Sequence, residues 1–174
     1  MYELLRKFLP NEYVKSIFDI HPATLKEQGV KGIITDLDNT LVAWDVKDAT
    51  PEVIEWFASM EKEGINITII SNNKLDRVKV FSDPLGVPYV YSARKPLTRA
   101  FKSVAKEMAL QVDEVVVIGD QILTDVLGGN RAGFYTILVV PVVTSDAKIT
   151  KINRKLERIV LNHMRKQGKI SWEE

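Results

Sequence analysis

The sequence predicts an α/β protein built on an open parallel sheet of about five strands. Short apolar runs without a helical period alternate with segments in which apolar residues recur at helical spacing, the pattern of strand–helix–strand units. The segments between the first three strands hold only enough residues for one helix each, so right-handed crossovers fit and an inserted domain does not. We expect strands at 32–36, 66–70, 87–91, 114–118 and 134–140.

Helices are expected between these strands, and two of them have clear starting signals. Thr50 and Pro51 suit the cap and the first position of a helix that ends near Lys62. Pro96 similarly begins a helix that runs to about Leu110. The apolar side of the first of these helices is predicted to consist of Val53, Ile54, Trp56 and Phe57.

Two terminal segments flank a core at about residues 30–140, and we expect all 174 residues to form one domain. Residues 1–28 carry apolar residues at helical spacing, which predicts two short amphipathic helices. Their apolar residues are Leu4, Leu5, Phe8 and Leu9, then Val14, Ile17 and Phe18. Residues 148–165 predict a basic amphipathic helix with an apolar side formed by Ile149, Ile152, Leu156, Ile159, Val160 and Met164.

The composition excludes several kinds of chemistry. Without cysteine the chain has no disulfide, thiolate metal site or cysteine nucleophile, and His21 and His163 are too few for a histidine-rich metal site. No apolar run approaches the roughly 20 residues that span a bilayer, and the first residues lack the apolar centre of a signal peptide. We therefore expect a cytoplasmic protein, in which a hard cation held by carboxylates stays open.

The charge of the chain is unevenly distributed. The net charge is +1, yet residues 148–169 carry eight Lys or Arg against Glu157, a local balance of +7. The remaining residues therefore sum to about −6. This basic segment is a solvated face of a packed helix, or it contacts an anionic membrane. Nucleic acid is not expected as a partner, because the chain lacks an aromatic stacking pattern or a known nucleic-acid motif.

Polar residues follow each of the first four predicted strands. Taken singly, they have ordinary explanations, such as a helix cap at Ser71 or a solvated surface charge at Lys95. Because the carboxyl ends of parallel strands meet at one edge of a sheet, their regular placement predicts that they converge on one crevice. In chain order they are Asp36 and Asp38, Ser71 and Asn72, Arg94 and Lys95, and Asp120 with Asp125.

This series resembles the four motifs of the haloacid-dehalogenase-like (HAD) phosphohydrolases over roughly residues 30–140. The combination DLDNTLV, SNN, RKP and GDQILTDVLGGNRAG is similar to subfamily IIIA and its YqeG-like members, which are grouped with phosphatidylglycerophosphate phosphatases. The resemblance implies a three-layer Rossmann-like HAD fold without a cap domain. One departure is Gln121, which stands where many HAD enzymes have a second adjacent aspartate and leaves the supporting role to Asp125.

The resemblance also implies a mechanism for a phosphatase. Asp36 would attack phosphorus and form an aspartyl-phosphate, while Asp38 would act as general acid and then as general base. A Mg²⁺ ion would be held by the Asp36 carboxylate, the Asp38 backbone carbonyl and Asp120. Asp125 would support the metal or hold Lys95.

Substrate binding is assigned by the same resemblance. Ser71 would donate hydrogen bonds to phosphate oxygens, and Lys95 would offset charge on the nucleophile and the phosphoryl group. Asn72 and Arg94 are further candidates for binding the phosphate ester. Thr40 is expected to fix the loop after the nucleophile.

The substrate and the partners stay open at this level. A site without a cap is open to solvent, which suits a bulky or surface-bound ester such as phosphatidylglycerophosphate, with the protein peripheral at the inner membrane surface. A soluble-metabolite phosphatase is an alternative, as is a homo-oligomer whose partner subunit closes the site. The excursion at 41–50, with Trp44, is a hypothetical flap over the site.

A function from another class is a binding or assembly module that uses the HAD scaffold with little turnover. The complete set of acidic residues, Ser71 and Lys95 argues against it, because a scaffold has no physical need for carboxylates clustered around a lysine.

Overall fold

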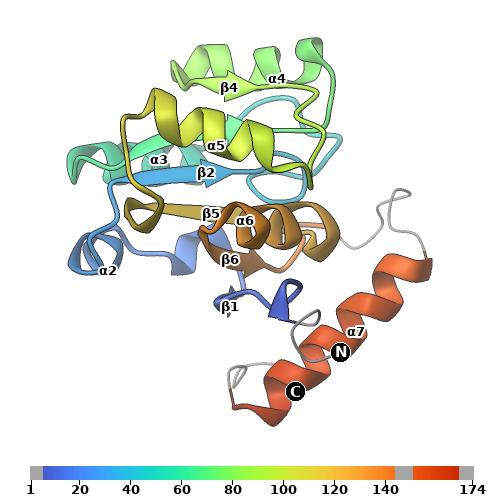
Figure 1. The fold of residues 1–174 in the computed structure, drawn as a ribbon. Coiled ribbons are helices and arrows are strands. Elements are labelled where there is room, and N and C mark those ends of the chain that lie inside the picture. Colours follow the sequence, from blue (N-terminus) through green and yellow to red (C-terminus); the bar gives the residue numbers. More distant parts are fainter. Residues whose placement is uncertain (1–5, 144–150, 169–174) are drawn as a thin grey trace.

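A computed structural model describes residues 6–143 and 151–168, with the backbone alone at 151–154. Its strands are β1 (Glu12–Val14), β2 (Gly32–Thr35), β3 (Asn66–Ile70), β4 (Tyr89–Val90), β5 (Val115–Gly119) and β6 (Tyr135–Val139). All neighbouring strands are parallel, and they form one sheet in the order β1-β6-β5-β2-β3-β4 (Figure 1). The predicted open parallel α/β fold is therefore confirmed, with six strands in place of about five.

The additional strand lies in the N-terminal segment, where we predicted a second short helix. β1 pairs with β6, with Glu12 opposite Ile137 and Val14 opposite Val139. A 3₁₀ turn, Ile17–Asp19, and helix α2 (Pro22–Glu27) follow it. The prediction was wrong because hydrogen bonds to the distant β6 override the local apolar spacing, and Phe18 is 44% exposed. Leu4 and Leu5, of the first predicted helix, lie outside the described residues.

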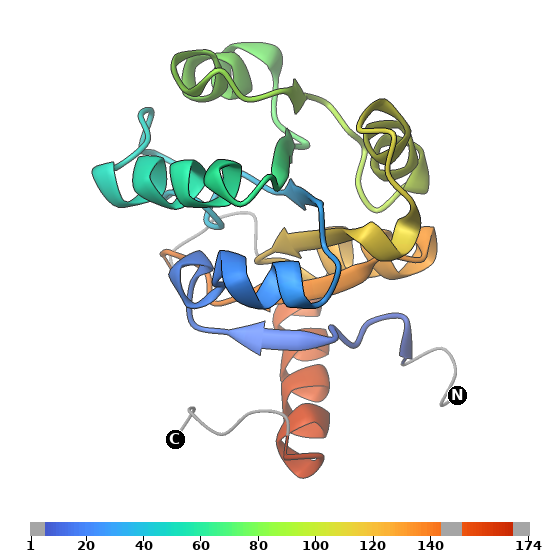
Figure 2. The ribbon, with the colours of Figure 1, turned by 90° about the vertical axis from the view of Figure 1, so that its left-hand side faces the viewer.

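Helices cover both faces of the sheet. The remaining helices are α3 (Pro51–Lys62), α4 (Leu75–Ser82), α5 (Thr98–Glu107), α6 (Leu127–Ala132) and α7 (Lys151–Lys166). Figure 2 places α2 and α3 on one side of the sheet and α5 and α6 on the other. Among the described residues no cap domain is inserted. The segment between β2 and β3, residues 36–65, contains one helix. The segment between β3 and β4, residues 71–88, contains one helix and a 3₁₀ turn.

The strands are buried on both faces because alternate residues point into different apolar layers. Ile33 packs with Trp56 and Met60 of α3, whereas its neighbour Ile34 packs with Phe101 of α5. Three of the four residues predicted to face inward from α3 are buried, but Ile54 is 49% exposed. The sheet is thus held rigidly between its helices, and its carboxyl edge is fixed in position.

The basic C-terminal helix predicted at 148–165 is present as α7, Lys151–Lys166, while residues 148–150 lie outside the described residues. Val160 and Met164 are buried against Ile122 and Val126, which belong to the segment just after β5. Ile159 is 47% exposed, so the apolar side of α7 is narrower than predicted. The structure also contains no described helix that is long and apolar enough to cross a membrane.

Candidate active site

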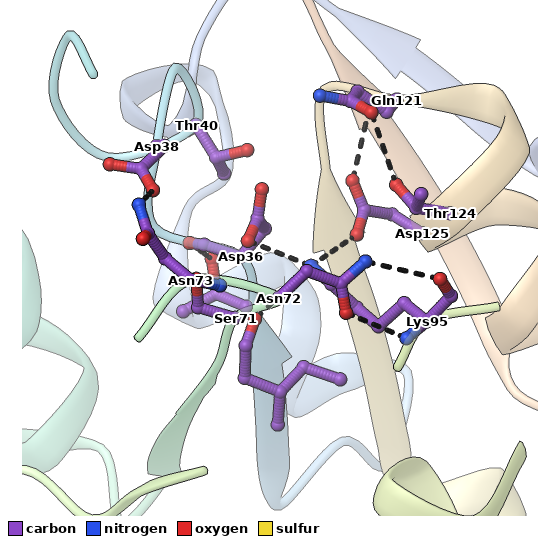
Figure 3. Close-up of polar contacts among 12 residues, drawn as sticks. Asp36, Asp38, Thr40, Ser71, Asn72, Asn73, Lys95, Gln121, Thr124 and Asp125 are labelled. Atoms are coloured by element: carbon purple, nitrogen blue, oxygen red, sulfur yellow. Dashed lines mark hydrogen bonds and ion pairs between the residues drawn. The ribbon is translucent and has the colours of Figure 1, made fainter. Parts of the chain in front are cut away.

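Most of the predicted strand-end residues lie together at the carboxyl edge of the sheet, and Arg94 is the exposed exception. Figure 3 shows Asp36, Asp38, Ser71, Asn72, Lys95 and Asp125. Asp36 comes directly after β2, Ser71 after β3 and Asp120 after β5, and these strands are neighbours in the sheet. Lys95 reaches the same place from the loop that follows β4. This is the position at which open α/β sheets bind ligands.

Lys95 is the centre of the site. Its ammonium Nζ lies 2.7 Å from Asp36 Oδ1 and 2.7 Å from Asp125 Oδ1, and it donates a third hydrogen bond to the Ile70 carbonyl at 3.1 Å. All three ammonium protons therefore have an acceptor. Lys95 is 6% exposed, so the charge is buried and its position is fixed.

The backbone around Lys95 explains how a lysine is turned inward here. The Asn72 side chain accepts from the Lys95 N–H at 2.7 Å and donates to the Lys95 carbonyl at 3.1 Å. Arg94 has a positive φ of 58°, a conformation that few residues other than glycine adopt. As a result Lys95 points into the site while the adjacent Arg94 is exposed, with no ion pair to a described residue.

Asp125 reaches Lys95 because the segment after β5 is a π-helix, Ile122–Val126. Its carboxylate also accepts from the Gln121 N–H at 3.1 Å. Single π-turns inside helices frequently occur at functional sites. A Cβ on Gly119 would collide with the Asp125 side chain, so only glycine allows this close approach.

Three buried carboxylates form an acidic cluster. Asp36, Asp120 and Asp125 each offer an oxygen, and the three oxygens lie within 4.8 Å of one another. Thr40 donates to Asp120 Oδ1 at 3.0 Å, while Asp120 Oδ2 is buried without a hydrogen-bond partner. An unpartnered buried carboxylate oxygen is costly, and an all-oxygen donor set suits a hard divalent cation. The residues therefore fit a metal ion.

Burial and crowding govern the electrostatics of the cluster. Burial raises the pKa of Asp36 to about 6, a shift that Lys95 opposes and Asp125 reinforces. Burial, Asp36 and Asp125 also raise the pKa of Asp120 well above its usual range. Burial by itself would lower the pKa of Lys95, but Asp125 and Asp36 outweigh burial and raise it, so the ammonium stays charged. The single ammonium group of Lys95 thus partly compensates the negative charge of three carboxylates.

The Asp38 carboxylate lies apart from this cluster. Asn73 Nδ2 donates to Asp38 Oδ2 at 3.1 Å, and Arg77 Nε donates to Asp38 Oδ1 at 2.9 Å. The chain turns sharply after Asp38, because Asn39 has a positive φ of 64°. Both oxygens of this side chain are therefore held by residues that follow β3.

Ser71 and Trp44 occupy opposite environments. Ser71 is 1% exposed, and its Oγ accepts from the Asn73 N–H at 3.0 Å, so its own O–H proton can be donated.

Trp44, in the excursion at 41–50, is 48% exposed. The Lys47 carbonyl of this excursion accepts a hydrogen bond from Arg77 Nη1 at 3.3 Å.

Sequence reasoning missed two residues of the site, Asn73 and Arg77. Asn73 adjoins the Ser71-Asn72 pair and could have been included with it. Arg77 gave no usable signal, because an arginine in the first turns of an amphipathic helix is most simply a solvated charge.

Comparison with known sequences identifies relatives over the whole chain. Residues 92–166 match the family described as HAD-hydrolase-like. The chain is 58% identical over 172 residues to "Probable phosphatase YqeG" of Bacillus subtilis, covering 98% of this chain and 100% of that protein. It is 28% identical to "Phosphatidylglycerophosphate phosphatase 1, chloroplastic/mitochondrial" of Arabidopsis thaliana, covering 92% of this chain and 49% of that longer protein.

Solved structures share the fold. A 3-deoxy-D-manno-octulosonate 8-phosphate phosphatase from Moraxella catarrhalis, in complex with a magnesium ion, a phosphate ion and a KDO molecule, aligns with a TM-score of 0.53. The alignment covers 83% of this chain and 92% of that one at 15% identity, a level that shows similarity of fold alone. The Bacillus relative, at 58% identity and covered over its full length, shows the family. This chain therefore belongs to the YqeG family of HAD-like phosphatases.

Proposed function

We propose that this chain is a Mg²⁺-dependent phosphomonoesterase that works through an aspartyl-phosphate on Asp36. The observation that carries the proposal is the buried Lys95 ammonium, bound at 2.7 Å to both Asp36 and Asp125 beside the partnerless Asp120 oxygen. Burying three carboxylates around one ammonium is costly for the fold. A binding module would gain nothing from this arrangement, whereas phosphoryl transfer requires it.

The proposed reaction has two displacements at phosphorus. A carboxylate oxygen of Asp36 attacks the phosphorus atom, the ester P–O bond breaks, and the departing oxygen takes a proton from Asp38. Asp38, now ionised, accepts a proton from a water molecule that attacks the same phosphorus and releases Asp36 and inorganic phosphate. The first step thus leaves Asp38 as the base that the second step needs, and the second step returns the proton to Asp38.

The remaining residues bind and orient the phosphoryl group. Lys95 offsets negative charge on Asp36 and on the phosphoryl oxygens, and the Ser71 O–H donates to one of those oxygens. Asp125 keeps Lys95 in place. Mg²⁺, held by the carboxylates of Asp36 and Asp120 and the backbone carbonyl of Asp38, would neutralise charge as the phosphoryl group is transferred. Arg94 is exposed at the rim, where it can meet an anionic substrate.

For the substrate we propose a lipid phosphate of the phosphatidylglycerophosphate class. The similarity to the phosphatidylglycerophosphate phosphatase of Arabidopsis supports this choice. An uncapped site, as found in the described residues, accommodates a phosphate that is still attached to a membrane-embedded lipid. The alternative is a soluble phosphate ester, which the same chemistry would hydrolyse.

The outer stripe of α7 supports a peripheral contact with an anionic membrane. Its exposed residues recur at helical spacing on the side opposite Val160 and Met164, and no acidic residue is among them. Each Lys or Arg near an anionic surface contributes about 1 kcal/mol. The stripe consists of Lys155, Arg158, Ile159, Asn162, Arg165 and Lys166.

Phosphate release from a defined panel tests this function. The panel contains p-nitrophenyl phosphate, sugar phosphates, nucleotides and phosphatidylglycerophosphate in mixed micelles, each with Mg²⁺ or with EDTA. We expect Mg²⁺-dependent hydrolysis that prefers the lipid and is lost in Asp36→Asn. Hydrolysis of soluble esters alone would contradict the lipid substrate, and no hydrolysis of any ester would contradict the enzymatic proposal.

Vesicle sedimentation tests the membrane contact separately. Wild type should sediment at low salt with vesicles that contain phosphatidylglycerol and remain in solution with neutral phosphatidylcholine vesicles. Replacing Lys155, Arg158 and Lys166 by Gln should release the protein. Equal sedimentation of the triple variant would show that α7 is not the contact.

A further inference from the structure

Arg77 of α4 contacts both the Asp38 side chain and the excursion at 41–50. Its Nε donates to Asp38 Oδ1 at 2.9 Å, and its Nη2 lies 2.9 Å from the same oxygen. Its Nη1 donates to the Lys47 carbonyl at 3.3 Å. The side chains of Arg77 and Asp38 are only 15% and 17% exposed, so this ion pair is largely shielded from solvent.

The rest of the guanidinium is also constrained. It lies 6.0 Å from the centre of the Phe81 ring, one helical turn further along α4. An arginine fork that is stacked on a ring and bound at two other points has little freedom to move. Its partner carboxylate is therefore held in one orientation.

Asn73 completes the support from the other side. Its Nδ2 donates to Asp38 Oδ2 at 3.1 Å, so each carboxylate oxygen of Asp38 accepts a hydrogen bond from a residue after β3. A carboxylate has about four lone-pair positions. Arg77 and Asn73 leave at least one position on each oxygen for a proton that is exchanged with the substrate or with water.

We propose that Arg77 is a positioning residue for proton transfer by Asp38. The inference rests on the proposed function, in which Asp38 protonates the leaving oxygen. Efficient proton transfer requires the acid within hydrogen-bond reach of that oxygen. Because Arg77 also binds the Lys47 carbonyl, it links the general acid to a later part of the same loop and to α4, independently of the Lys95 cluster.

The proposal predicts a loss that depends on the leaving group. An alkoxide is a poor leaving group and needs a proton from Asp38, whereas p-nitrophenolate leaves readily without one. Arg77→Met keeps the aliphatic stem over Phe81 but removes the fork. We expect kcat/KM for octyl phosphate, which reports formation of the aspartyl-phosphate and not its hydrolysis, to fall by about 10–10², since a displacement of about 1 Å can cost 10²-fold. The loss on p-nitrophenyl phosphate should be much smaller.

Three further variants complete the experiment. Asp38→Asn should show the same selectivity with a larger loss on octyl phosphate, about 10²–10⁴. Adding Arg77→Met to Asp38→Asn should cause little further loss, because both act through one group. Arg77→Lys should recover part of the activity, since a single ammonium restores the charge but not the fork. Lys79→Met, an exposed cation on the same helix, is the matched control and should be unaffected.

The outcomes separate this inference from the proposed function. If Asp38→Asn lowers kcat/KM equally for both esters, the general-acid role of Asp38 is wrong. If Asp38→Asn is selective but Arg77→Met slows both esters equally or not at all, Arg77 does not position Asp38. Thermal unfolding of each variant identifies a loss that comes from misfolding, and a selective loss in a fully folded Arg77→Lys is then decisive support.

Discussion

Single residues at this site are fixed by charge more than by apolar packing. Lys95 satisfies two carboxylates and a carbonyl within a buried space. Removing one member of a buried ion pair leaves its partners charged and without compensation, which costs more than the pair itself contributed. The strength of this coupling gives the first prediction.

Lys95→Met should abolish hydrolysis and lower the free energy of unfolding by about 3–5 kcal/mol, because Asp36 and Asp125 lose their shared cation. Urea unfolding followed by circular dichroism measures the second effect. Arg94→Met is the matched control, since the adjacent Arg94 is exposed and should change stability by less than about 0.5 kcal/mol. Equal unfolding midpoints for the two variants would contradict the central role of Lys95.

Secondary-structure elements differ in how far the sequence alone defines them. β1 has only three residues and pairs with β6 alone among the described strands. Asn11 extends this short ladder, since its Oδ1 accepts from the Thr136 N–H at 2.8 Å and its own N–H donates to the Thr136 carbonyl at 2.9 Å. A residue just outside the N-terminal strand therefore contributes to its attachment.

Asn11→Ala should destabilise the protein by about 1–3 kcal/mol, because the N–H of the buried Thr136 loses its acceptor. Asn11→Asp retains an oxygen at the same position and should destabilise it less. Both values come from urea unfolding at neutral pH. An Asn11→Ala variant as stable as wild type would mean that Thr136 finds another acceptor.

The long central elements could be predicted because their signals are local. β3 forms at 66–70 as expected, and α3 begins after the Thr50 cap, whose side chain accepts from the Val53 N–H at 3.4 Å. The polar residues at the strand ends could be predicted for the same reason, and most of them lie together at the carboxyl edge of the sheet. β1 could not be predicted in this way, because it forms only by pairing with a strand far along the chain. The contacting residues Asn11 and Thr136, for example, are 125 positions apart. The role of Arg77 depends on where α4 packs, which no local pattern specifies.

The whole molecule should be stabilised by the metal that its acidic cluster fits. A ligand that binds only the folded state stabilises it by about 2.7 kcal/mol at one hundred times its dissociation constant. We therefore expect Mg²⁺ to raise the melting temperature of wild type and EDTA to reverse the shift. Asp120→Asn should respond much less, whereas Asp113→Asn, an exposed acid before β5, should respond like wild type. An unchanged melting temperature in wild type would contradict a metal site at Asp120.

The pairing of β1 with β6 also has a consequence for how the protein is made. The ribosome releases Asn11 early, yet its partner Thr136 is 125 residues further on. At about 5–20 residues per second, that interval takes roughly 6–25 s. Throughout it the first strand has no place in the sheet, while the central strands can already pair. The first of the described strands to be synthesised is thus among the last to reach its final position, and a chaperone would find it exposed for that time.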